Sequence, residues 1–241
     1  MNIAVINGSP RGESASSREV ISILERLGGA DLQWTGVSRL DLLPEDQLEQ
    51  RVEELCRAPV LLVTAPLYID GLPATTIRAL ERYRKACLHR YGKRDGHVPE
   101  GGRVPEGGHP VQTGGQRVFA VVNCGFYEGS QNRHALEMVE HFCRESGLTW
   151  CGGVGIGTGE MIRGLKEVPL RAGVRRPVVA ALQRLVEAIG LPGGRLEENL
   201  YTQHRLPWWM YRLLGQLGWR RQARRNGVRR GALHDRPHGV V

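Results

Sequence analysis

The residues that point most clearly to chemistry form a short loop near the N-terminus. Residues 8–17, GSPRGESASS, contain two glycines, four serines and one arginine. They follow an apolar segment at 2–7 and precede a helical pattern. The first turn of a helix has unpaired N–H groups and the positive end of the helix dipole, so hydroxyls and a guanidinium there can bind a phosphate. We therefore predict an anion site. The alternative is a plain helix cap, in which a serine caps the helix and the glycines only form the turn.

The spacing of this loop excludes two widespread phosphate-binding motifs. It lacks the Gly-Lys-Ser/Thr ending of a Walker loop, and it lacks glycines at the first, third and sixth positions of a dinucleotide fingerprint. The anion site must therefore be of another type.

The elements that would position this loop alternate between strand and helix. Five apolar segments, each followed by a helical pattern, are found near residues 2–7, 31–37, 60–65, 117–124 and 150–156. This alternation predicts an α/β fold with a doubly wound, five-stranded parallel sheet in a three-layer α/β/α sandwich. Ligands of such sheets bind at the carboxyl ends of the strands, so the loops after the strands are the candidate site.

The loop after the third strand is apolar where exposed loops are usually polar. It begins with Pro66, and Gly71 follows within it, so its backbone is expected to be well defined. Leu67, Tyr68 and Ile69 would form an apolar wall for a flat aromatic ligand. The alternative is that these side chains pack beneath the loop as a satellite of the core.

The loop after the fourth strand, NCGFYEGSQNRH, offers hydrogen-bonding groups beside an aromatic ring. The side chains that can form these hydrogen bonds, beside Phe126, are those of Asn123, Tyr127, Asn132, Arg133 and His134. Glu128 and His134 raise the alternative of acid–base chemistry, but a helix start and a solvated helix face are the favoured interpretations. The loop after the fifth strand is rich in glycine without matching a nucleotide fingerprint, which is a weak signal for close approach of a ligand.

The composition of the chain limits the classes of protein to which it can belong. The chain has 241 residues, of which 41% are hydrophobic, enough for one large or two small domains. Its five cysteines form no CxxC pair, so we expect reduced thiols and no metal site, and we interpret Cys124 as a buried thiol at a strand end. No signal segment and no run of roughly 20 apolar residues is present, so a cytoplasmic location is expected.

Three loops in matching topological positions support a family resemblance. NGSPR followed by a pair of serines, PLY followed by a glycine and LPA, and NCGFYEG after the fourth strand resemble the flavodoxin-like NAD(P)H-dependent FMN reductases and NAD(P)H quinone reductases. The resemblance extends from residue 1 to about residue 190. It implies a flavodoxin-like fold, bound FMN, NADPH or NADH as electron donor, and a homodimer.

The resemblance also implies roles for particular residues. The FMN phosphate would be bound by Ser9, Arg11, Ser16 and Ser17. The isoalloxazine ring would lie against Pro66, Leu67, Tyr68 and Ile69, near Gly71, and Asn123, Gly125 and Tyr127 would line its other edge. Tyr68, Tyr127 and Asn123 are the candidates for shaping the open face of the flavin, and no catalytic side chain is assigned with certainty.

Two segments depart from this pattern. Residues 91–115 contain VPEGG twice and are expected to form a flexible Gly/Pro-rich insertion in a domain that spans 1–194. Residues 195–241 carry ten arginines against three acidic residues and are expected to form a basic, aromatic, helical extension. For this tail we favour packing against the sheet or a second subunit over contact with a membrane surface, and no nucleic acid partner is expected.

The expected function is therefore that of an FMN-containing oxidoreductase. It would transfer hydride from NAD(P)H to FMN and then electrons to a small acceptor such as a quinone, a nitro or azo compound, or free flavin. The alternatives are a flavodoxin-like electron carrier and a non-catalytic sandwich that binds a membrane or partner through the tail. Hydrolysis by acyl transfer is disfavoured because no GxSxG elbow is present.

Overall fold

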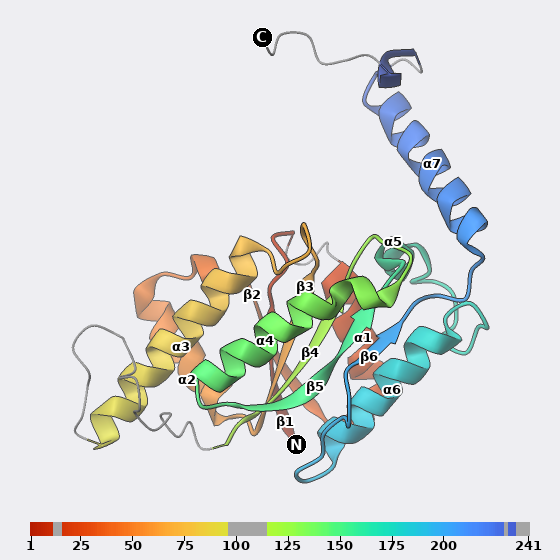
Figure 1. Cartoon of the computed structure of the whole chain (residues 1–241). Coiled ribbons are helices and arrows are strands. Elements are labelled where there is room, and N and C mark those ends of the chain that lie inside the picture. Colours follow the sequence, from red (N-terminus) through yellow and green to blue (C-terminus); the bar gives the residue numbers. More distant parts are fainter. Residues whose placement is uncertain (12–15, 96–114, 229–230, 235–241) are drawn as a thin grey trace, which may run out of the picture. The chain divides into compact units, whose positions relative to one another are not determined.

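The computed structural model describes residues 1–11, 16–95, 115–228 and 231–234 (Figure 1). Its strands are β1 (Asn2–Asn7), β2 (Gln33–Ser38), β3 (Val60–Pro66), β4 (Arg117–Asn123), β5 (Thr149–Ile156) and β6 (Leu200–Thr202). Its α-helices are α1 (Ser16–Gly28), α2 (Glu45–Arg57), α3 (Ala74–Asp95), α4 (Arg133–Glu145), α5 (Gly159–Gly164), α6 (Arg176–Gly190) and α7 (Trp208–Arg225).

All strands run parallel in one sheet of order β2-β1-β3-β4-β5-β6. The first five strands have the flavodoxin-like order, in which the chain reverses its direction of growth between β1 and β3. The predicted α/β class and doubly wound parallel sheet are confirmed, but the prediction of five strands is wrong. The sixth, β6, spans three residues and pairs Leu200 with Val154 at the edge of the sheet. A segment this short has no periodicity that would distinguish it from a loop.

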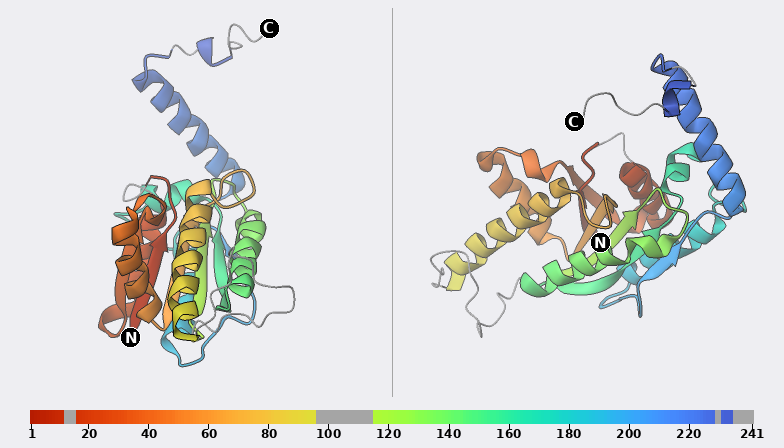
Figure 2. Two further views of the ribbon diagram at one scale, coloured as in Figure 1. Left: turned by 90° about the vertical axis from the view of Figure 1, so that its left-hand side faces the viewer. Right: turned by 45° about the horizontal axis from the view of Figure 1, so that its top comes forward.

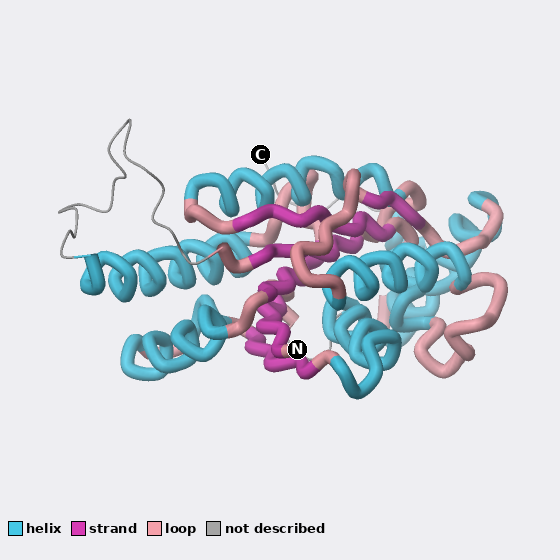
Figure 3. Tube along the Cα trace, turned by 90° about the horizontal axis from the view of Figure 1, so that it is seen from below, coloured by secondary structure: helices cyan, strands magenta, loops and turns pink. Residues whose placement is uncertain are grey.

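Helices lie on both faces of the sheet and make a three-layer sandwich (Figures 2 and 3). A hydrophobic cluster lies between the sheet and the helices on each face. Successive strand residues point to opposite faces, so Ala4 and Ile6 of β1 join one cluster and Ile3 and Val5 join the other. Helices α2, α3 and α4 cover the first face, and α1, α5 and α6 cover the second. The strands are buried on both sides, which explains why their sequences are continuous apolar runs.

The chain divides into two units, Met1–His204 and Arg205–Val241. This division lies ten residues after the predicted boundary at residue 194. Leu196 is buried in the cluster formed with α1 and α6, β6 extends the sheet, and His204 is buried with 2% of its surface exposed. These contacts make residues 195–204 part of the sandwich.

The second unit contains the predicted helix. Pro207 precedes α7, consistent with its fixed φ angle at a helix start, and no residue of α7 is buried. In the first unit, α3 extends to Asp95, so the first five residues of the predicted insertion are helical. Residues 96–114 lie outside the described residues. Within the described ranges, no helix is both long and apolar enough to cross a bilayer.

The unit boundary predicts different behaviour for two truncations. A chain of residues 1–204 should unfold cooperatively at a midpoint close to that of the full chain, whereas a chain of residues 1–194 should unfold at least about 5 °C lower. The physical reason is the lost burial of Leu196 and the lost β6 ladder, together with the exposure of the β5 edge. Thermal unfolding followed by circular dichroism measures both. Equal midpoints for the two truncations would contradict the boundary at residue 204.

Candidate functional site

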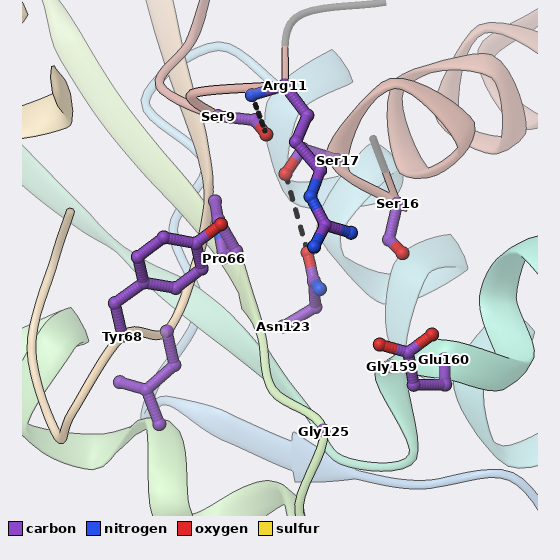
Figure 4. Close-up of a pocket in the computed structure, with 11 residues that line it drawn as sticks. Ser9, Arg11, Ser16, Ser17, Pro66, Tyr68, Asn123, Gly125, Gly159 and Glu160 are labelled. Atoms are coloured by element: carbon purple, nitrogen blue, oxygen red, sulfur yellow. Dashed lines mark hydrogen bonds between the residues drawn. The ribbon is translucent and has the colours of Figure 1, made fainter. Parts of the chain in front are cut away.

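Four loops at the carboxyl edge of the sheet converge on one pocket (Figure 4). Its volume of about 180 Å³ is less than the roughly 300–1,000 Å³ of sites that enclose a drug-sized ligand, so such a ligand would extend beyond it. The lining comes from the loop after β1, the first turn of α1, the loops after β3 and β4, and the start of α5: Ser9, Arg11, Ser16, Ser17, Pro66, Leu67, Tyr68, Asn123, Gly125, Gly159 and Glu160.

The loop after β1 is fixed by backbone contacts at Gly8. The Gly8 N–H donates to the Thr64 carbonyl at 2.8 Å, and the hydroxyls of Thr75 and Thr76 donate to the Gly8 carbonyl at 2.9 and 2.8 Å. A Cβ at residue 8 would overlap the Thr76 side chain. Glycine at this position therefore allows the start of α3 to pack directly on the loop.

Side-chain turns then curl the backbone between Asn7 and Arg11. The Ser9 N–H donates to the Asn7 side-chain oxygen at 3.2 Å, and the Arg11 N–H donates to the Ser9 hydroxyl at 3.2 Å. Arg39, the residue after β2, donates from its guanidinium to the Pro10 carbonyl at 3.1 Å. The same guanidinium donates to the Asp41 carboxylate at 2.9 and 3.1 Å. The loop is thus anchored from both neighbouring strands.

The side of the pocket next to α1 is rich in hydrogen-bond donors. Ser16 and Ser17 are the first two residues of α1, where backbone N–H groups lack partners within the helix. The Arg11 side chain extends from the loop into the pocket toward Asn123 (Figure 4). The Ser17 hydroxyl donates a long hydrogen bond of 3.5 Å to the side-chain oxygen of Asn123. This side of the pocket is suited to an anion, as the sequence predicts.

The opposite wall is apolar and comes from the loop after β3. The Leu67 N–H donates to the Asn123 carbonyl at 2.8 Å, which continues the β3–β4 pairing past the end of the strand. Leu67 is buried, Pro66 is half-buried, and Tyr68 exposes 44% of its surface. The Tyr68 ring is therefore accessible to a ligand at the mouth of the pocket.

Three predicted contact residues lie outside this lining: Ile69, Gly71 and Tyr127. Tyr68 and Gly71 exchange backbone hydrogen bonds of 2.9 and 3.2 Å across a turn. Its two central residues, Ile69 and Asp70, have φ angles of 47° and 61°, the conformation of a type I′ turn. This turn leaves the Ile69 side chain fully exposed, so Ile69 does not extend the apolar wall of the pocket.

Two lining residues, Gly159 and Glu160, are absent from the predicted set. They begin α5, and the Gly159 N–H donates to the Cys124 carbonyl at 2.7 Å. A Cβ at residue 159 would lie 2.6 Å from that carbonyl oxygen and 3.0 Å from the Asn123 side-chain nitrogen. The signal in the sequence was the glycine-rich run after the fifth strand. Such a run indicates that a ligand or another backbone segment comes close to this loop, but it does not identify the residue that faces the ligand.

The loops after β4 and β5 are bonded to each other. The Thr158 N–H donates to the Phe126 carbonyl at 2.6 Å, and Cys124 donates its N–H to Ile156 at 2.9 Å. A Cβ at Gly157 would lie 2.6 Å from the carbonyl carbon of Glu128 and 2.7 Å from the backbone nitrogen of Gly129. Gly125 and Gly159, on either side of this contact, are therefore held at a fixed separation.

His204, a buried histidine that follows β6, supports this pair of loops. Thr158, with φ of 53°, donates its hydroxyl proton to the Gly157 carbonyl and accepts the His204 N–H at 3.0 Å. The His204 Nδ1 lies 2.9 Å from the same hydroxyl, so the ring and the backbone of His204 both contact Thr158. Burial, together with the smaller effect of the positive charge of Arg175, lowers the pKa of His204 from 6.5 to about 4. The imidazole is therefore neutral at pH 7.

Arg175 is itself buried, with 1% of its surface exposed. Its guanidinium donates to the carbonyls of Leu165 at 2.9 Å and Val168 at 2.6 Å and so holds the loop between α5 and α6. Burial lowers the pKa of Arg175. The cation and the neutral imidazole together fix the position of α5, which contributes Glu160 to the pocket.

The side chains considered for acid–base or nucleophilic chemistry lie elsewhere. Burial raises the pKa of the Cys124 thiol, and the Asn132 side chain donates to its sulfur at 3.3 Å, as expected of a structural thiol. His134 is exposed on α4 and pairs with Glu137 at 2.9 Å. Glu128 is exposed and precedes a short 3₁₀ turn. None of the three lines the pocket.

Comparison with known proteins finds similarity at the level of structures. No family model and no curated sequence matches the chain. The chain is similar to Trp repressor binding protein from Bacillus subtilis, with 16% identity over 76% of this chain and 96% of that one and a TM-score of 0.45. It is also similar to an FMN-dependent NADH-azoreductase from Bacillus anthracis in complex with FMN, with 9% identity over 79% of this chain and 100% of that one and a TM-score of 0.47.

A third similar structure is an NADPH-quinone reductase from P. pentosaceus, with 11% identity over 77% of this chain and 97% of that one and a TM-score of 0.47. The names of the azoreductase and the quinone reductase fall in the family that the sequence motifs resemble. At these identities and TM-scores, the flavodoxin-like assignment of the fold rests on the strand order.

The contact at Gly157 predicts the effect of one added methyl group. Gly157→Ala should lower the free energy of unfolding by about 1–3 kcal/mol, because the nearest atoms belong to the backbone and cannot rotate away. Gly164→Ala is the matched control, since a Cβ at residue 164 meets no atom within 4 Å. Urea unfolding of both variants measures the difference. Equal stabilities would show that the two loops are not held in contact at Gly157.

The state of His204 predicts a dependence of stability on pH. The unfolded chain binds a proton at this residue below pH 6.5, whereas the folded chain binds it only near pH 4. The contribution of His204 to the free energy of unfolding should therefore be at its maximum above pH 6.5. It should fall by about 3 kcal/mol as the pH drops to 4. His204→Asn removes the titrating group and should lack this component of the decrease.

Urea unfolding at pH 7.5, 5.5 and 4.5 measures this component as the difference between wild type and variant. His141→Asn, at an exposed position of α4, is the control and should leave the pH profile nearly unchanged. A His204→Asn profile parallel to that of the wild type would contradict the neutral, buried imidazole.

Proposed function

We propose that the chain is a flavin-dependent oxidoreductase that binds FMN, accepts hydride from NADPH or NADH, and delivers electrons to a small acceptor such as a quinone, a nitro or azo compound, or free flavin. The observation that carries the proposal is the meeting of a donor-rich loop and an apolar, aromatic wall in one pocket. This pocket lies at the carboxyl ends of β1 and β3, the switch point at which flavodoxin-like sheets bind FMN.

The anion side of the pocket fits the phosphate of FMN. Ser9, Ser16 and Ser17 offer hydroxyls, Arg11 offers a guanidinium, and α1 offers the positive end of its dipole. In Figure 4 the carboxylate of Glu160 lies across the pocket from Ser9, on the side that also carries Ser16, and the Arg11 guanidinium lies between Ser9 and Glu160. Since a carboxylate repels a phosphate, this arrangement favours the phosphate at the Ser9 end of the pocket.

The apolar side fits an aromatic ring system. Pro66 and Leu67 provide apolar surface, and Tyr68 provides an accessible aromatic side chain at the mouth. Asn123 and Gly125 face this wall from the end of β4. Because the loop after β3 is tied to β4 through the Leu67 N–H, the width between the two is fixed before a ligand binds.

The cofactor supplies the redox chemistry when bound, and the chain supplies binding, orientation and electrostatics. Arg11 and the α1 terminus compensate negative charge, and the Leu67–Asn123 contact sets the spacing of the pocket walls. The open mouth beside Tyr68 leaves room for a donor and an acceptor to bind in turn. A homodimer, as implied by the family resemblance, would bring further surface to this mouth.

The proposal predicts a specific optical result. Protein incubated with FMN and desalted should retain a flavin spectrum, which anaerobic NADPH or NADH should bleach because hydride reduces the flavin. The more effective donor identifies the physiological nicotinamide. Retained flavin that neither donor bleaches would favour the electron carrier over the reductase. Failure to retain FMN at all would contradict the proposed site.

The anion site predicts a change of affinity that depends on the phosphate. Arg11→Ala should weaken FMN binding about 10- to 100-fold, the loss of one or two charge-assisted hydrogen bonds, and should leave riboflavin binding unchanged. Arg18→Ala is the matched control, because Arg18 pairs with Glu25 at 3.3 Å and does not line the pocket. Fluorescence titration with both flavins measures these affinities. Equal weakening for FMN and riboflavin would place Arg11 away from the phosphate.

A further inference from the structure

The two units of the chain differ sharply in charge. Residues 205–241 contain nine arginines, one aspartate, and neither lysine nor glutamate, which amounts to +8. The whole chain also carries +8, so the first 204 residues are formally neutral. The entire charge excess of the protein therefore belongs to the smaller unit.

This unit also exposes large apolar side chains on α7. Trp209 is 60% exposed, and Leu213, Leu214 and Leu217 are each about half exposed. Single exposed apolar residues are common, but a contiguous group of this size on one helix indicates a surface that something covers. No residue of α7 is buried.

The apolar and basic side chains occupy the same sector of the helix, one after the other along its axis. At 3.6 residues per turn, the apolar members fall within a sector of roughly 140°. They are Trp209, Met210, Leu213, Leu214 and Leu217. The four arginines of the last turns, Arg220, Arg221, Arg224 and Arg225, continue that sector toward the C-terminus.

The opposite sector differs in character. It holds Gly215, Gly218 and Gln222, two exposed tryptophans, Trp208 and Trp219 (54% and 73%), and Arg212, whose guanidinium lies over the Trp208 ring at 5.5 Å. The helix thus has one face that is apolar along its first half and cationic along its last turns, and a second face on which the large exposed apolar side chains are two separated tryptophans, Trp208 and Trp219.

Charge distinguishes three of the surfaces that could cover this face, namely a second copy of α7, nucleic acid and a membrane. Two copies of α7 packed in parallel would place four arginines against four, and an antiparallel pair would place them against apolar side chains. Residues 205–228 contain no acidic residue that could compensate either arrangement. Nucleic acid would pair with the arginines but would leave the leucines and Met210 in water. An anionic bilayer offers phosphates and acyl chains side by side, which satisfies both halves.

We propose that α7 is an interfacial helix that binds the surface of an anionic lipid bilayer. Trp209, Leu213 and Leu217 enter the boundary between head groups and acyl chains, and the arginines of the last turns contact lipid phosphates. This proposal goes beyond the oxidoreductase function and does not depend on it.

Co-sedimentation of the full chain with vesicles tests the proposal. At about 0.15 M salt, vesicles of equal parts phosphatidylcholine and phosphatidylglycerol should bind the protein, whereas vesicles of phosphatidylcholine alone should bind it at least about tenfold more weakly, because arginines near an anionic surface each contribute about fivefold. Tryptophan emission should shift to shorter wavelength only with the anionic vesicles. Absence of binding to the anionic vesicles would overturn the proposal.

Two matched pairs of variants test the face of the helix. Trp209→Ala should weaken binding about tenfold or more, whereas Trp208→Ala, which removes a similarly exposed tryptophan from the opposite sector, should change it less than about threefold. Arg224→Gln should weaken it about fivefold and Arg212→Gln much less. Equal effects within either pair would overturn the assignment of the face. Unchanged thermal midpoints verify that each variant is folded.

Two further measurements address the other occupants. Analytical ultracentrifugation without lipid should show no association that Trp209→Ala abolishes. Double-stranded DNA should not displace the protein from anionic vesicles when added at equal phosphate concentration. Association through Trp209 without vesicle binding would favour a second copy of the chain. Tight DNA binding without vesicle binding would favour nucleic acid. Either result would overturn the proposal.

Discussion

Close packing of backbone against backbone at the carboxyl edge of the sheet is the constraint on which the rest of the structure depends. At Gly157 and Gly159, a Cβ would meet the backbone of another segment, and at Gly8 it would meet the Thr76 side chain, in each case at a distance that real side chains do not adopt. These glycines let the loops after β1, β4 and β5 approach α3 and each other through N–H and carbonyl groups. The walls of the pocket are therefore set by hydrogen-bonded backbone, and the lining side chains project from fixed positions.

This arrangement explains why a segment remote from the pocket matters to it. The stretch from β6 to His204 supplies no lining residue, yet the Thr202 carbonyl accepts the Gly157 N–H at 2.8 Å, and His204 binds Thr158 through both its backbone and its ring. Removing this stretch would free the loop that begins α5 and carries Glu160. The neutral imidazole beside the buried Arg175 guanidinium is accepted because each group has hydrogen-bond partners.

The sequence allowed the order of elements and most of the pocket lining to be predicted, because both depend on local patterns. Apolar runs such as 60–65 are buried strands, and loops at strand ends must meet at one edge of a parallel sheet. Features that depend on long-range contacts could not be predicted. β6 is a strand only because β5 offers its edge, and residues 195–204 join the sandwich only because Leu196 and His204 find burial there.

The turn at Ile69 marks a different limit. A β-branched residue at positive φ is rare, and such a conformation costs about 1–3 kcal/mol. The residue types at 69 and 70 therefore do not predict a type I′ turn. The paired backbone bonds between Tyr68 and Gly71 hold the turn in this conformation. The same turn that removes Ile69 from the wall directs Tyr68 to the mouth of the pocket. A strained, exposed isoleucine thus adjoins Tyr68, the aromatic residue among those that line the pocket, and the geometry of both follows from where β3 ends.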